Sequence, residues 1–106
     1  MNNEFEFMDA TKAKKLSIWS NLPKIIKSCI TFAAHNGDLH VTISKLKCNE
    51  KDRKLIFETN DVIDYKVTKV NADIMLALKF LGFKVSVDNN YSGVNFEDTK
   101  LIISWD

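Results

Sequence analysis

The chain contains 106 residues, of which 45% are hydrophobic and 27% are charged, with three Gly and one Pro. This length fits a single domain spanning residues 1–106, and the composition excludes a disordered chain, a linker or a fibre. Fifteen Lys and Arg against fourteen Asp and Glu give a net charge of +1, so no overall field favours nucleic acid or a membrane as the partner.

The cysteine count and the hydropathy favour an aqueous, reducing compartment. Cys29 and Cys48 are too few for a disulfide framework, and we expect both to be reduced thiols, although the sequence leaves open one bridge between them. The longest apolar run, Ile74 to Leu78, is far shorter than the roughly 20 residues of a membrane helix. The first seven residues lack the pattern of a secretory signal. We therefore expect a cytoplasmic protein.

Two helices are predicted in the first third of the chain. The first can be capped by Asp9 or Thr11, and Pro23 interrupts it and suits the first turn of the next helix. In the second helix, Lys24 to His35, apolar residues recur at three- and four-residue spacing. Gly37 then supplies a left-handed cap at its end.

The middle of the chain favours strands. Polar and apolar residues alternate from Leu39 to Lys45, which predicts a half-buried strand. Cys48 to Asp52 is predicted to be a polar turn, with Lys54 to Glu58 as the partner strand. Thr59 to Asp61 is expected to be another turn, and the β-branched residues of Val62 to Val70 favour a further strand.

The last third combines one helix with two strands. A helix capped by Asn71 should run to Leu81 and stop at Gly82, and its nearly uniform apolarity predicts the most buried helix. Phe83 to Val87 and Lys100 to Trp105 are predicted strands, separated by a polar loop from Asp88 to Thr99.

These elements predict an α+β fold. The expected architecture is a small antiparallel or mixed sheet of about four to five strands, with two to three helices packed on one face. Apolar residues on the two clearest helices and on one face of the strands are sufficient for one core.

Three short motifs resemble a pattern in small proteins of phages and giant viruses. These motifs are the helix opening Asp9-Ala10-Thr11-Lys12-Ala13, the junction Leu78-Lys79-Phe80-Leu81-Gly82-Phe83-Lys84-Val85-Ser86, and the ending Leu101-Ile102-Ile103-Ser104-Trp105. In those proteins a helix ends in leucine, glycine and an aromatic residue, and the last strand ends in isoleucine, serine and tryptophan. The resemblance covers most of the chain except Cys48 to Val70. It implies a viral accessory or virion protein and assigns no site residues.

The chain contains no complete motif for catalysis or cofactor binding. Asp88 to Gly93 begins like a calcium loop, but Thr99 stands where the bidentate Glu is needed. Structural zinc sites use ligand pairs spaced two to four residues apart. His35 and His40 are not spaced in this way, either from each other or from the two cysteines. A cysteine and a histidine could meet in the fold as a nucleophile and its base, but the sequence has no oxyanion or phosphate-binding motif to accompany such a pair. We therefore expect no enzyme activity, no cofactor and no metal.

The segment from residue 9 to residue 27 is locally basic. It carries five lysines and one acidic residue, with a tryptophan among them, which is a footprint of contact with nucleic acid. The candidate residues for this alternative function are Lys12, Lys14, Lys15, Trp19, Lys24 and Lys27. Solvated Lys on a helix face over a packed tryptophan is the simpler interpretation. Arg53 is the only arginine, which disfavours phosphate recognition.

Protein–protein binding is the function that these observations favour. Phe5 and Phe7 alternate with glutamates and predict an edge strand or a docking segment, and Tyr91 and Phe96 lie in the predicted long loop. We expect a non-enzymatic viral accessory or virion protein that binds a host or viral protein through these residues or through an exposed sheet edge. Inhibition of a host factor is one such role, exerted in the host cytoplasm or in the particle.

Overall fold

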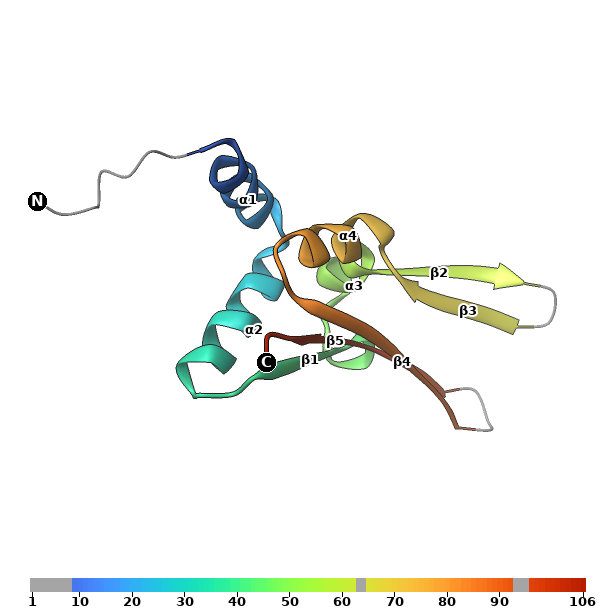
Figure 1. The fold of residues 1–106 in the computed structure, drawn as a ribbon. Helices are drawn as coiled ribbons and strands as arrows, with labels where there is room; N and C mark the ends of the chain where they lie inside the picture. Colours follow the sequence, from blue (N-terminus) through green and yellow to red (C-terminus); the bar gives the residue numbers. More distant parts are fainter. Residues whose placement is uncertain (1–8, 63–64, 93–95) are drawn as a thin grey trace, which may run out of the picture.

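A computed structural model describes residues 9–62, 65–92 and 96–106 of the chain (Figure 1). Its helices are α1 (Ala10–Asn21), α2 (Lys24–His35), α3 (Glu50–Ile56) and α4 (Ala72–Phe80), with a short 3-10 helix, η2 (Lys45–Lys47). Its strands are β1 (His40–Ser44), β2 (Phe57–Val62), β3 (Tyr65–Val70), β4 (Lys84–Ser92) and β5 (Phe96–Ser104).

The strands form two antiparallel sheets. One has three strands in the order β1-β5-β4, and the other is the β2-β3 hairpin. Val41 pairs with Ile103 in one sheet, and Phe57 pairs with Val70 in the other. The β2-β3 and β4-β5 hairpins extend away from α1 and α2 (Figure 1). With helices packed against the sheet, the predicted α+β fold is confirmed.

The predicted helix boundaries follow from caps that the structure shows. The Asp9 carboxylate accepts a hydrogen bond of 2.8 Å from the Lys12 N–H, which identifies Asp9 as the cap of α1. Pro23 occupies the cap position before α2 rather than its first turn. Gly37 and Gly82 follow α2 and α4 with φ of 81° and 98°, as a left-handed helix end requires.

One hydrophobic core joins the helices to both sheets. Ile26 of α2, Ile56 of α3 and Leu78 of α4 are fully buried. Leu101 and Ile103 of the central strand β5 are also fully buried. One buried cluster includes residues of all these elements, so α2 and α4 pack on the same core.

Two predictions for residues 48–58 are wrong. Residues 50–56 form α3 instead of a turn and the start of a strand, and only Phe57 and Glu58 lie in a strand, β2. In addition, β1 pairs with β5 rather than with this segment. Asn49 caps α3 by accepting 2.8 Å from the Asp52 N–H, and acidic residues in the first turn with basic ones in the last favour the helix dipole. Arg53 fixes the preceding turn, because its guanidinium donates to the carbonyls of Lys45 and Cys48, each at 3.2 Å.

The turn predicted at Thr59 to Asp61 and the loop predicted at Asp88 to Thr99 are also wrong. Thr59–Asp61 lie inside β2. Most of the second segment extends β4 and β5 into one long hairpin, in which Asp88 pairs with Lys100. Cross-strand pairing therefore outweighs the turn preference of isolated Asn and Asp residues.

The prediction that the helix after Asn71 is the most buried is wrong. In α4, Ile74 and Leu78 are buried, whereas Leu76 and Phe80 are exposed. In α2, by comparison, Ile26, Ile30 and Ala33 are buried. Apolar residues all round a helix do not bury it when only one side faces the core.

Candidate functional site

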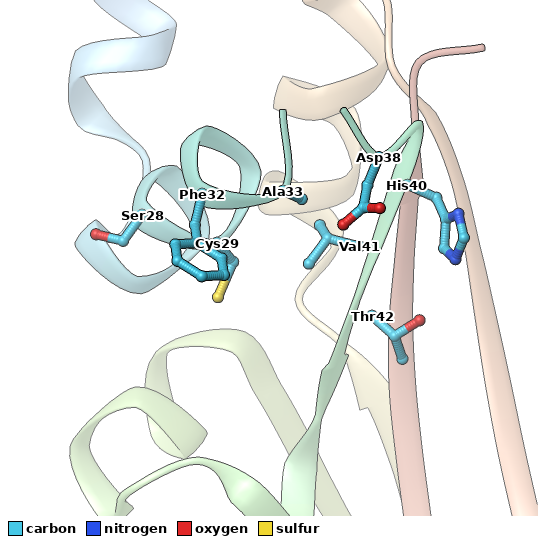
Figure 2. Close-up of a pocket in the computed structure, with 8 residues that line it drawn as sticks. All are labelled: Ser28, Cys29, Phe32, Ala33, Asp38, His40, Val41 and Thr42. Atoms are coloured by element: carbon cyan, nitrogen blue, oxygen red, sulfur yellow. The ribbon is translucent and has the colours of Figure 1, made fainter. Parts of the chain in front are cut away.

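A groove lies between α2 and β1, with a volume of about 600 Å³. This volume is in the range of pockets that hold ligands. Figure 2 shows that α2 forms one wall and that β1, with the turn before it, forms the other. The α2–β1 groove is lined by Ser28, Cys29, Phe32, Ala33, Asp38, His40, Val41 and Thr42.

The wall formed by β1 is an edge of the sheet. In the described part of the chain, β1 pairs with β5 and with no other strand. Trp105 N–H donates to Leu39 C=O at 3.0 Å, and the register continues this ladder through Val41 opposite Ile103. Backbone groups of successive residues in an antiparallel strand point to alternate sides. Those of His40 and Thr42 therefore point away from β5, and both residues line the groove.

The wall formed by α2 is apolar. Phe32 is 71% exposed, the largest value among the exposed large hydrophobic residues described. Cys29 is half-buried and Ala33 is buried beside it. Val41 of β1 points toward this wall (Figure 2). An occupant that covered Phe32 would bury aromatic surface that is now in water, which is the main favourable term in association.

A polar end closes the apolar part of the groove. Asp38 N–H donates to Ala33 C=O at 2.9 Å, and Gly37 N–H donates to Ala34 C=O at 3.0 Å. This pair of bonds is a Schellman motif, which fixes how the chain leaves α2. It places Asp38 at the start of the groove, and Figure 2 shows its carboxylate between α2 and β1. Asp38 is the one formally charged lining residue.

The two cysteines are free thiols, as expected, with Cys48 buried. Burial raises the pKa of Cys29 above its ordinary value of 9.0, and the Asp52 charge raises it further. The pKa of Cys48 is raised for the same leading reason. A raised pKa leaves less reactive thiolate. His40 also points to the other side of β1 from Cys29 (Figure 2), so the groove does not show a paired nucleophile and base.

The structure uses part of the basic candidate set for packing. Trp19 stacks on Phe83 with ring centroids 6.5 Å apart and is partly buried against the core. The Lys14 ammonium lies 5.2 Å from the centre of the Phe80 ring. Lys27 donates to the carbonyl of Ser20 at 3.0 Å. The side chains of Lys12, Lys15 and Lys24 are exposed.

The other predicted interaction residues lie away from the groove or outside the description. Phe5 and Phe7 lie outside the described residues. Tyr91 belongs to β4 and Phe96 to β5, where each occupies a ladder position in the long hairpin. Within residues 9–62, 65–92 and 96–106, no three His, Cys, Asp or Glu side chains are grouped to hold a metal ion. No described helix has the length and apolarity of a membrane span.

The sequence prediction named an exposed sheet edge but missed the residues of the groove. Phe32 carried a usable signal, since it widens the apolar stripe of its helix at one margin, three residues after Cys29 and seven after Ile25. When an apolar stripe is wider than the face that packs on the core, its margin leaves apolar surface exposed to water.

Comparisons with protein-family models, with curated proteins and with solved structures found no match.

Proposed function

We propose that this protein works by binding another protein, without a catalytic step, and that the contact is strand addition at β1. An extended segment would lie in the α2–β1 groove and pair with the backbone groups of His40 and Thr42. Its side chains on one face would pack on Cys29 and Phe32.

The observation that carries this proposal is that β1, which lies at a sheet edge among the described residues, stands beside an exposed aromatic residue. The edge supplies directional hydrogen bonds, and Phe32 supplies apolar area. Either feature alone is common on protein surfaces. Together in one groove of about 600 Å³, they suit an extended peptide better than a flat protein face.

The proposal places the protein among viral accessory or virion proteins, in line with the resemblance of its terminal motifs. In that setting, the groove would bind an extended segment of a host or viral protein and block the contacts that this segment normally makes. Nucleic-acid binding through the basic helix is the competing function, and the packing of Trp19 on Phe83 makes it the weaker candidate.

Selection from a displayed library of random twelve-residue peptides tests the proposal. We expect enriched peptides with alternating apolar residues. Their binding to the ¹⁵N-labelled protein should shift the amide signals of residues 29–33 and 38–42. Enrichment of peptides that shift α1 or α4 instead, or no enrichment above a blank support, contradicts the proposal.

A matched pair of variants provides the control. Phe32→Ser should weaken the selected peptides about five- to tenfold, because the aromatic contact is lost. Leu76→Ser removes another exposed apolar residue, on α4, and should leave binding unchanged. Equal losses of affinity in the two variants would show that the peptides bind any exposed apolar residue rather than the groove.

A further inference from the structure

We infer that the α2–β1 groove selects an extended segment in which a large apolar residue is flanked by Lys or Arg. This inference deepens the proposed function and rests on it. Two features of the groove specify the occupant: the apolar wall at Cys29 and Phe32, and the carboxylate of Asp38 at the end of the same channel.

The strand geometry relates the two features to positions in a peptide. Side chains of an added strand alternate between the α2 side and the opposite side of β1. Residues two positions apart therefore share a face. When an apolar side chain rests on Phe32, the nearest residue that can reach toward Asp38 on that face lies two positions away.

Charge decides the type of that residue. The groove lining contains one carboxylate and no Lys or Arg, so its local field favours a cation although the whole chain has a net charge of +1. Asp38 is exposed, so this preference adds selectivity more than affinity. The segment Glu4-Phe5-Glu6-Phe7 of this chain has the right alternation but is acidic, and we favour a basic partner segment over it.

Three peptides test the inference directly. The first, acetyl-Thr-Lys-Thr-Phe-Thr-Lys-Thr-amide, reads the same in both chain directions and places both Lys on the face of the Phe. The second has Glu in place of both Lys. The third is residues 1–8 of this protein. Their affinities are measured by NMR titration, with the rate of Cys29 alkylation in Cys48→Ser protein as a second readout of groove occupancy.

We expect the Lys peptide to bind roughly five- to tenfold more tightly than the Glu peptide, and to slow alkylation of Cys29. Asp38→Lys should reverse this preference. Asp88→Lys, which makes the same charge change on β4, should preserve it. When the peptide amides are N-methylated one at a time, only every second position should abolish binding, because only those amides face β1.

Each other result overturns the inference in a distinguishable way. If the Glu peptide binds the groove equally well or better, or if Asp38→Lys does not change the preference, the groove binds strands without charge selection and the proposed function stands. Tighter binding of residues 1–8 identifies a segment of this chain as the occupant. If no peptide shifts the groove signals, the inference fails, and the library selection decides the proposed function.

Discussion

Phe32 and Phe80 are exposed aromatic residues on two helices of the same core, and their surroundings differ. Phe80 of α4 is 42% exposed and lies under the Lys14 ammonium at 5.2 Å, so a neighbour within the chain already covers part of its ring. Phe32 of α2 is 71% exposed and faces a groove whose other wall is β1, an edge strand in the described part of the chain.

The difference separates a surface that the chain itself covers in part from one that, in the proposed function, a partner covers. Exposed apolar atoms are ordinary on proteins and by themselves identify nothing. Beside unpaired backbone groups, however, an aromatic residue can gain apolar contact and directional hydrogen bonds from one occupant.

The largest expected effect comes from the core beneath each surface. Ile26→Ala under α2 and Leu78→Ala under α4 remove fully buried side chains, and each should lower the free energy of unfolding by about 2–5 kcal/mol. Urea unfolding monitored by circular dichroism measures both. If the free energy of unfolding falls by less than about 1 kcal/mol in either variant, the helix that carries that residue does not pack on the shared core as described.

The two helix ends provide a matched pair of backbone changes. Gly37→Ala and Gly82→Ala should each cost about 1–2 kcal/mol, because both positions have positive φ while no atom lies within 4 Å of an added Cβ. Only Gly37→Ala should also reduce the preference for the Lys peptide over the Glu peptide, because the Schellman motif at Gly37 places Asp38. An equal loss of this preference in both variants would contradict this role.

Lys14→Ala tests the covered surface. Loss of the ammonium over Phe80 should lower the free energy of unfolding by about 0.5–1 kcal/mol and leave groove binding unchanged. Lys15→Ala, on the same helix, is the control. If both variants lower affinity for single-stranded RNA and flatten its salt dependence, the basic helix binds nucleic acid, and the alternative function gains support.

The smallest expected effect concerns the thiols. Because burial raises the pKa of Cys29, the Cys48→Ser protein should react with iodoacetamide more slowly than a free thiol near pH 9. Asp52→Asn should recover a small part of the rate, since burial remains. The folded thiols hold their protons above the ordinary pKa of 9.0, so their contribution to stability is complete below pH 9 and is lost as pH rises further. A rate equal to that of a free thiol would contradict the burial.

The sequence predicts local structure well where periodicity and caps agree. The helix from Lys24 to His35, the strand that follows it and the stop at Gly82 depend on neighbouring residues, and the structure confirms them. Residues 48–58 were mispredicted because the cap at Asn49 and the bonds of Arg53 outweigh strand propensity in Leu55 and Ile56.

The groove was beyond sequence reasoning for a different reason. One of its walls depends on a long-range pairing, β1 with β5, which brings residue 41 opposite residue 103 and leaves β1 at the sheet edge among the described residues. No local pattern specifies which strand lies at an edge, because strand order depends on the whole topology. Phe32, at the margin of the apolar stripe of α2, could have been noted from the sequence, but its role depends on the strand edge beside it.

Amide hydrogen exchange along β1 tests the central claim most directly. In the free protein we predict slow exchange at Val41 and Ile43, whose N–H groups face β5, and fast exchange at Thr42, whose N–H faces the groove. Saturation with a selected peptide should slow exchange at Thr42 without changing that at Ser86 of β4. Protection of Thr42 in the free protein, or no added protection with the peptide bound, would contradict strand addition at β1.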